Sequence, residues 1–275
     1  MKYVTFCQGD GAPAPGYVSG ERVISLRDSG FPDLLSIIAS GGAAGADGPS
    51  YPLSEVRLLA PIPRPPKIIC VGLNWADHAR EAKLEIPKVP TIFAKFPTAV
   101  IGPGDAIVLP KASRKPDYEA EFAFVVGRGG RHIPAARWRE HVFGYTNFND
   151  VSARDFQMAT TQWIMGKTFD TFAPFGPWIV SADEIEDPHA LDITLSINGE
   201  VMQSSNTREL IFKIPELIEF LSSVFTLEPG DLVATGTPAG VGFARRPPRY
   251  LRAGDDVVVS VQGLGQLRNP VIAED

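Results

Sequence analysis

The sequence predicts an α+β protein that is mainly β, with a strand-dominated main domain behind a small N-terminal α/β domain. The 26 Gly and 25 Pro residues among 275 indicate many turns between short elements. Strand-like apolar runs recur along the chain, whereas segments with helical spacing are few. A chain of this length falls between one and two domains and can bury a large core.

Residues 1–62 are predicted to form the small N-terminal domain. "KYVTF" indicates a strand, "GYVSGERVISL" a hairpin that turns at Ser19-Gly20, and "PDLLSIIAS" a short helix that ends at Gly41. The stretch "GGAAGADGPSYP" indicates a linker, and "APIPRPPK" adds prolines before the strand "IICVG". The main domain is therefore predicted to span residues 63–275.

Three segments of the main domain share a turn followed by a strand. They are "GPGDAIVLP" from Gly102, "EPGDLVATG" from Glu228 and "RAGDDVVVSV" from Arg252, and each enters its strand through Gly-Asp. The match is too short for a true repeat. It predicts an antiparallel, hairpin-rich sheet system.

The clearest helical segment is "NTRELIFKIPELIEFLSSVFTL". Asn206 and Glu209 have the spacing of a capping box, and Pro215 suits the first turn of a second helical segment. The spacing predicts an apolar stripe that packs into the core, formed by Leu217, Phe220, Leu221 and Val224.

Charge and composition exclude several classes of partner. The net charge is −6, and no run of Lys or Arg forms a stripe that could follow a phosphate backbone, which excludes nucleic acid as the main partner. Cys7 and Cys70 stand alone in apolar contexts, so neither a disulfide framework nor a thiolate zinc site is expected. With no signal-peptide pattern and no membrane-length apolar run, the sequence predicts a cytoplasmic protein with no membrane partner.

Two acidic residues, Glu119 and Glu121, interrupt the apolar run "PDYEAEFAFVVG". Residues i and i+2 of a strand point to the same face, so their carboxylates would be neighbours. Like charges that close raise a carboxyl pKa unless a positive charge lies between them, so the pattern requires a cation, a basic side chain or open water. The alternative is a strand with one face in water.

A second pattern, "GLNWADHAREA", places His78 and Glu81 at positions i and i+3. If residues 77–82 are helical, the imidazole and the carboxylate lie on one face and can share a proton. The alternative is an ordinary exposed helix whose charged side chains lie in solvent.

The segment "GYTNFNDVSARDFQ" places Asp150, Arg154 and Gln157 within two helical turns. Asp150 could instead cap a helix, and Arg154 could pair with Asp150 or Asp155. These alternatives remain open from the sequence alone.

Lys167 lies in "MGKTFDTFAPFGPW", a Phe- and Pro-rich stretch with few other charges. A partly buried lysine there requires an anionic partner, and the alternative is a surface lysine. Farther along, "ATGTPAGVG" follows a strand and could bring backbone N–H groups and the Thr237 hydroxyl close to an anion. This loop lacks the Walker lysine and the G-x-G-x-x-G pattern, so a tight turn is the alternative.

Taken together, these five motifs resemble the fumarylacetoacetate hydrolase family in their order and spacing, from about residue 65 to residue 272. The resemblance implies a mixed β-sandwich roll for the main domain. It also implies one Mg²⁺ or Mn²⁺ held by Glu119, Glu121 and Asp150. Three carboxylates without a His or Cys ligand suit such a hard cation better than zinc or copper.

The resemblance implies an enzyme that acts on a small 2-oxo acid through an enol or enolate. For a hydrolase that cleaves a C–C bond of an acylpyruvate-like substrate, His78 and Glu81 would activate water. Arg154, Gln157 and Lys167 match positions that bind substrate and stabilise oxyanions, and Thr237 is expected to bind substrate. An oxaloacetate decarboxylase or an isomerase of the same family is the alternative.

Three further expectations follow from the resemblance. The segment "DHAREAKLEIPKVPTIFAKFPTAV" resembles a mobile lid that closes over the substrate. Ile164 and Met165 are expected to make the approach to Lys167 apolar. Family members usually pair through the main domain, and the 16 Phe and 4 Trp residues supply more large apolar groups than a loop-rich core hides, so a homodimer is expected.

Overall fold

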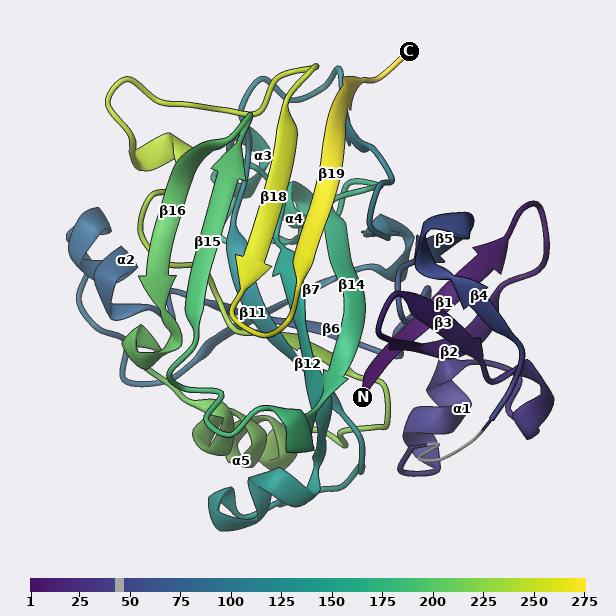
Figure 1. The fold of residues 1–275 in the computed structure, drawn as a ribbon. Coiled ribbons are helices and arrows are strands. Elements are labelled where there is room, and N and C mark those ends of the chain that lie inside the picture. The colour runs from purple at the N-terminus through teal and green to yellow at the C-terminus, as the bar shows by residue number, and fades with distance from the viewer. Residues whose placement is uncertain (43–46) are drawn as a thin grey trace.

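A computed structural model describes residues 1–42 and 47–275 of the chain and shows two packed sheets with few helices (Figure 1). This confirms the predicted α+β, mainly β class. Part of the predicted linker, residues 43–46, lies outside the described residues.

The larger sheet runs through both the N-terminal region and the main domain. Its strand order is β4-β3-β2-β1-β14-β12-β11-β17-β6-β7, with β5 paired to β1 and β8 paired to β14. The strands are β1 (Lys2–Gln8), β2 (Ala14–Ser19), β3 (Arg22–Ser25), β4 (Ser50–Pro52), β5 (Val56–Leu59), β6 (Ile68–Gly72), β7 (Thr91–Lys95), β8 (Val100–Ile101), β11 (Ala120–Val126), β12 (Val142–Asn149), β14 (Ala173–Ser181) and β17 (Leu232–Ala234).

The second sheet packs against the first and has the order β16-β15-β18-β19-β9 (Figure 1). Its strands are β9 (Ile107–Leu109), β15 (Asp192–Ile197), β16 (Glu200–Asn206), β18 (Asp256–Val261) and β19 (Gln266–Ala273), and a separate small ladder joins β10 (Pro116–Asp117) to β13 (Ser152–Ala153). Most neighbours are antiparallel, but β6–β17, β8–β14 and β9–β19 are parallel. The prediction of an antiparallel, hairpin-rich system therefore holds for most pairs and was wrong for these three, because their partner strands come from distant parts of the chain and not from adjacent hairpins.

The three Gly-Asp turns share one hydrogen bond that explains their similar sequences. In each turn the aspartate side chain accepts from the backbone N–H three residues earlier: Asp105 from Gly102, Asp231 from Glu228 and Asp255 from Arg252, at 2.8–2.9 Å. The preceding glycine has a φ between +81° and +89° in all three turns, which favours Gly. The motif therefore sets the entry to a strand but leaves the strand's partner undetermined.

The helices of the described residues are short, and they are α1 (Leu34–Ala39), α2 (Ala76–Ala82), α3 (Arg154–Gln157), α4 (Ile164–Lys167) and α5 (Ile214–Val224). Helix α5 starts beside Pro215 as predicted, and Asn206 caps only a 3₁₀ turn at Thr207–Glu209. The buried face of α5 carries Ile214, Leu217, Ile218 and Leu221. The predicted stripe was wrong at Val224, which is exposed because it ends the helix.

The main core lies between the two sheets and is built on β11. Phe122, Phe124 and Val126 point into it and meet apolar residues of β15 and β18. Ala123 and Val125 point to the opposite side, where a second cluster with Cys70 covers the other face. Both faces of β11 are thus buried, and the alternative of one face in water was wrong.

The N-terminal strands extend the main sheet, because β1 pairs with β14 at Lys2–Val180 and Tyr3–Ile179. Ser19 pairs with Arg22, so the hairpin turns at Gly20-Glu21, one residue later than predicted. No helix among the described residues is long and apolar enough to cross a membrane.

Candidate metal centre and active site

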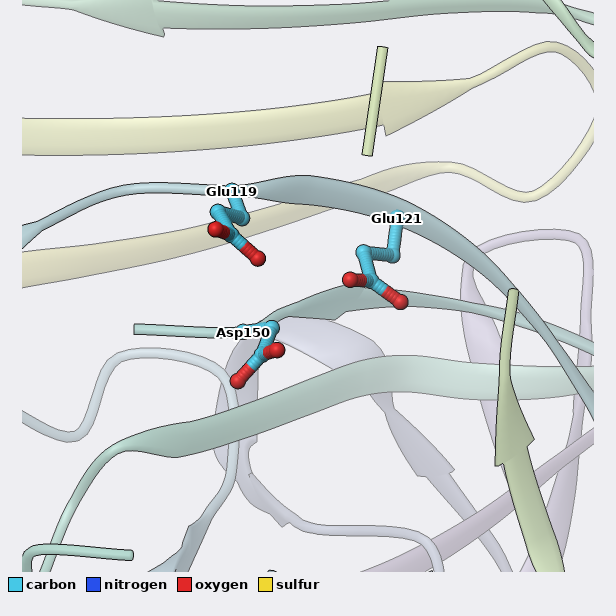
Figure 2. Close-up of side chains that lie close together, drawn as sticks. All are labelled: Glu119, Glu121 and Asp150. Carbon is cyan, nitrogen blue, oxygen red and sulfur yellow. The ribbon is translucent and has the colours of Figure 1, made fainter. Parts of the chain in front are cut away.

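Three carboxylates meet where β11 begins and the neighbouring strand β12 ends. Glu121 lies on β11, Glu119 precedes this strand by one residue, and Asp150 directly follows β12. Glu119 is thus outside the strand, in contrast to the prediction, but the backbone N–H of Asp150 donates to its carbonyl at 2.9 Å and holds the two segments together. Ligand oxygens of the three residues all lie within 4.8 Å of one another, and Figure 2 shows the side chains converging.

Two buried lysines neutralise part of this cluster. Lys167 Nζ contacts Glu119 Oε2 at 2.8 Å and Asp150 Oδ2 at 2.6 Å, and Lys95 Nζ contacts Asp150 Oδ1 at 2.5 Å. Burial alone would raise the pKa of Glu119, but Lys167 and Arg154 lower that pKa to about 2. The surface-lysine alternative for Lys167 was therefore wrong, as was the helix-cap role for Asp150, since Ala153 precedes α3.

Glu121 is the carboxylate of this cluster with no cationic side-chain contact among the described residues. It accepts one hydrogen bond, from the backbone N–H of Gly236 at 2.8 Å, and is 1% exposed. Burial raises its pKa well above the ordinary value, and the neighbouring Asp150 and Glu119 raise that pKa further. A divalent cation among the three carboxylates would supply the missing positive charge, and oxygen ligands suit Mg²⁺ or Mn²⁺.

Arg154, at the start of α3, is buried beside the same cluster. Its Nε contacts Asp117 Oδ2 at 2.9 Å, and its Nη1 contacts Glu119 Oε1 at 2.6 Å and Gln157 Oε1 at 2.8 Å. The alternative that Arg154 pairs with Asp150 or Asp155 was therefore wrong. Its Nη2 is buried and has no hydrogen-bond partner among the described residues, which leaves one charged N–H group available to an anion.

His78 and Glu81 lie on α2 with the predicted spacing. His78 Nδ1 is 3.1 Å from Glu81 Oε2, and Glu81 Oε1 accepts from the backbone N–H of Gly240 at 2.9 Å. Partial burial would raise the pKa of Glu81, but the hydrogen bonds from His78 and Gly240 outweigh it, so that pKa lies below its ordinary value. An ionised Glu81 can hold the proton of the ring on Nδ1 and leave Nε2 as the acceptor.

A pocket of about 300 Å³ joins these groups. Its polar lining includes His78, Glu119, Glu121, Arg154, Gln157, Lys167 and Thr237. A larger hollow of about 830 Å³ lies between the N-terminal region and the main domain, and none of these residues lines it. The smaller pocket therefore brings the candidate site residues together.

The Gly-rich loop after β17 contacts both halves of the site. Gly236 donates to Glu121, and Gly240 donates to Glu81. The Thr237 hydroxyl accepts from Gln203 Nε2 at 2.8 Å. The loop is therefore more than a tight turn, and its backbone N–H groups bind protein carboxylates.

Sequence reasoning missed two buried residues, Lys95 and Gln203. Gln203 lies on β16, accepts from the backbone N–H of Ala120 at 2.9 Å and donates to Thr237 and to the Pro238 carbonyl. Gln203 thus connects the Gly-rich loop after β17 to Ala120, the residue between Glu119 and Glu121. The lysine in the strand "TIFAK" was a usable signal for Lys95, whereas nothing marks Gln203 in the sequence.

The predicted apolar approach through Ile164 and Met165 was wrong. Met165 is 62% exposed, and neither residue lines the pocket. Trp163 and Met158 line it instead. The short helix α4 directs its last residue, Lys167, inward, and this turns Met165 outward.

Comparison with known proteins shows the family. Residues 67–272 match the model of the fumarylacetoacetate (FAA) hydrolase C-terminal family, and residues 1–61 match that of Rv2993c-like, N-terminal. The chain belongs to the fumarylacetoacetate hydrolase family. It is 50% identical over 226 residues to mitochondrial oxaloacetate tautomerase FAHD2A of Bos taurus, covering 82% of this chain and 72% of that protein. The human FAHD2A protein is 47% identical over 232 residues, with 84% and 74% covered.

Solved structures of this family share the whole fold. The fumarylacetoacetate hydrolase of Exiguobacterium antarcticum is 38% identical with a TM-score of 0.91, and all of both chains is covered. The 2-hydroxyhepta-2,4-diene-1,7-dioate isomerase of Mycobacterium marinum is 36% identical with a TM-score of 0.84, covering 100% of this chain and 99% of that one. Relatives within this family therefore carry names of hydrolases, isomerases and tautomerases.

Proposed function

We propose that this protein is a divalent-metal-dependent enzyme that interconverts the enol and keto forms of a small 2-oxo acid. One pocket brings together the His78–Glu81 pair, the carboxylate cluster and the Arg154 Nη2 group that has no partner among the described residues. This convergence is the observation that supports the proposal. The relatives named oxaloacetate tautomerase, at 47–50% identity, support it.

The residues have separate roles in this reaction. Arg154 Nη2 binds the carboxylate of the substrate, and Lys167 and Gln157 line the pocket beside it. His78 Nε2 removes the proton from C3, and the electron pair of the broken C3–H bond forms the C2=C3 double bond. The protonated Nε2 then returns this proton to the C2 oxygen, where the enol O–H bond forms. Glu81 orients the ring through its contact with Nδ1.

Glu119, Glu121 and Asp150 would hold the Mg²⁺ or Mn²⁺ ion. When bound, the ion supplies positive charge that stabilises the negative charge developing on the substrate oxygen. The carboxylate oxygens fit such an ion, since one member of the cluster otherwise stays without a positive partner.

The test follows the ultraviolet absorbance of freshly dissolved enol oxaloacetate with enzyme plus Mg²⁺, with enzyme plus a chelator, and without enzyme. We expect fast decay only with the metal-loaded enzyme. Decay that is equally fast with the chelator would rule out the metal, and decay at the uncatalysed rate throughout would rule out tautomerisation of this substrate.

Hydrolysis of an acylpyruvate is a second candidate, because the His78–Glu81 pair could equally deprotonate water. Pyruvate released from acetylpyruvate in the presence of Mg²⁺ would support it. Enol decay without pyruvate release would assign the pair to proton transfer alone.

A further inference from the structure

The cations that line the pocket are already engaged at the carboxylate cluster. Lys167 contacts Glu119 and Asp150, and Arg154 contacts Asp117 and Glu119. Only Arg154 Nη2 stays without a partner among the described lining residues that carry a positive charge. The pocket can therefore pair one substrate carboxylate with a spare charged N–H group, but it offers no second one.

Much of the remaining lining is apolar and aromatic. It consists of Val71, Leu73, Ala82, Leu84, Phe93, Met158, Trp163 and Phe243. Thr91 adds a hydroxyl, and none of these residues carries a charge. We name Phe93 and Trp163 the aromatic wall.

Packing fixes the aromatic wall in place. The Trp163 ring packs edge-on against Phe93 at 5.6 Å between centroids. It also lies directly on Gly72, where an added Cβ would stand 2.4 Å from the indole. Lys167 Nζ lies 5.0 Å from the centroid of the Phe93 ring, so the aromatic wall begins beside the carboxylate cluster. A substrate bound at the cluster must therefore place its other end among uncharged groups.

We propose that this site selects 2-oxo acids whose substituent at C3 is uncharged and apolar, alkyl or aryl, over 2-oxo diacids. A second carboxylate at the aromatic wall would lose water without gaining a cation, whereas an apolar group buries surface there. This inference rests on the proposed function for its reaction, but it concerns binding and can be tested apart from turnover.

The test uses two 2-oxo acids without a C3 hydrogen, which therefore cannot enolise. Trimethylpyruvate and dimethyloxaloacetate differ by one methyl group in place of one carboxylate, and calorimetry with the Mg²⁺-loaded protein measures their affinities. We expect trimethylpyruvate to bind about tenfold tighter, as apolar pockets discriminate. Equal affinity, or tighter binding of the diacid, would overturn the selectivity whether or not any enolisable acid is turned over.

A positive charge placed at the rim of the pocket should reverse the preference in part. Met158 is 66% exposed at the rim of the pocket, so Met158→Arg adds a cation without disturbing the core. We expect it to shift the affinity ratio about threefold toward dimethyloxaloacetate, as for a partly exposed ion pair. Val224→Arg adds the same charge at a site 64% exposed on α5, outside the pocket, and should leave the ratio unchanged. An unchanged ratio in Met158→Arg, or an equal shift in both variants, would contradict the proposal.

Turnover of phenylpyruvate and oxaloacetate tests the proposed function and the substrate selectivity separately. If neither acid is tautomerised above the uncatalysed rate, the proposed function fails and the affinity ratio alone decides the selectivity. If both are turned over and oxaloacetate has the higher kcat/KM, the selectivity fails and the function stands.

Discussion

At the scale of single residues, the three carboxylates of the cluster differ in the buried positive charges that they neutralise. Glu119 balances Arg154 and Lys167, and Asp150 balances Lys95 and Lys167, whereas Glu121 contacts only a backbone N–H. Removing a charge that balances buried cations costs about 3–5 kcal/mol, because it leaves them unpaired. Removing the charge of Glu121 relieves repulsion instead.

The first prediction follows from this difference. Glu121→Gln should abolish Mg²⁺ binding in calorimetry while the melting temperature in chelator stays unchanged or rises, since the Gln carbonyl can still accept from Gly236. Glu119→Ala should lose both metal binding and stability. Glu140→Gln, on the exposed surface, serves as the control. If Glu121→Gln still binds Mg²⁺ with wild-type affinity, the metal site is misplaced.

The second prediction concerns His78, which lines the pocket but contacts Glu81 rather than the carboxylate cluster. His78→Ala should lower kcat about 100-fold or more while metal affinity stays nearly constant, because the ring moves protons and binds no ion. Kinetics and calorimetry on the same preparation check this. A parallel loss of metal binding would make His78 a ligand.

Site residues could be predicted from the sequence where an unusual residue type also had a spacing set by local structure. Glu119, Glu121 and Asp150 form an unusual acidic pattern, and the i, i+3 spacing of His78 and Glu81 is fixed by helix geometry. The partner of Arg154 was not predictable, because Asp117 lies 37 residues away and reaches it only through the fold. Gln203 was hidden for the same reason, since its contacts with Ala120 and Thr237 depend on how β16 packs.

At the scale of elements, the loop after β17 connects the two halves of the site. Gly236 has a φ of +89°, and a Cβ there would stand 2.8 Å from the Val71 carbonyl oxygen. Any larger residue must therefore move the N–H group that binds Glu121. The loop needs this glycine for both its backbone conformation and its close approach to β6.

The third prediction compares two glycines with the same backbone conformation. Gly254 also has a φ of +89°, but a Cβ there meets nothing within 4 Å. Gly254→Ala should lose about 1 kcal/mol of unfolding free energy and keep full activity. Gly236→Ala should lose more stability and also weaken Mg²⁺ binding and kcat. Equal effects of the two changes in denaturant unfolding and in kinetics would show that the close approach is unimportant.

Part of the segment that was predicted as a lid belongs to the sheet. From Thr91 the segment forms β7, the edge strand that pairs with β6, so residues 83–90 are the part between α2 and this strand. Leu84, Ile86 and Val89 in this stretch are exposed. The segment "TIFAK" has the apolar pattern of a strand, but the resemblance to a family lid led to its assignment to the lid.

The fourth prediction follows from this shorter lid. Hydrogen exchange should slow in residues 83–90 when Mg²⁺ and trimethylpyruvate bind, because their apolar side chains then cover the pocket. Residues 91–95 should exchange at the same rates in both states, since their pairing with β6 does not depend on the ligand. The same exchange rate in residues 83–90 with and without ligand would count against gating.

At the scale of the whole molecule, one sheet runs from the N-terminal strands to β7, and the site lies at β11 near its centre. The class of the fold was predictable because turn residues and apolar runs are local signals. The strand order was not, since long connections bring β6 beside β17 and β1 beside β14, and no local pattern records such pairings. The predicted cytoplasmic location stays a prediction, and the FAHD2 relatives named above are mitochondrial proteins.

The predicted homodimer needs a different argument from the one the sequence offered. The Trp residues supply little of the surface, because Trp75 and Trp138 are buried and Trp163 and Trp178 are half-buried, and among the described Phe residues only Phe96 is exposed. Large apolar residues are exposed instead at Leu84, Ile86, Val89, Phe96, Met158 and Met165. Helix α4 packs on β7, and the backbone N–H of Phe96 donates to Thr168, so Phe96 and Met165 gather in one region, whereas Met158 lines the pocket.

The last prediction is that the protein forms a homodimer that covers this region, since exposed apolar patches mark interfaces and two-fold pairs are the commonest oligomers. Light scattering at micromolar concentration should give twice the chain mass of 29.7 kDa. Phe96→Glu should shift the protein toward the single-chain mass, because it buries a charge in the interface. Val224→Glu, on α5, should leave the mass unchanged. A wild-type mass near that of one chain would refute the dimer, and a dimer that survives Phe96→Glu would place its interface on another face.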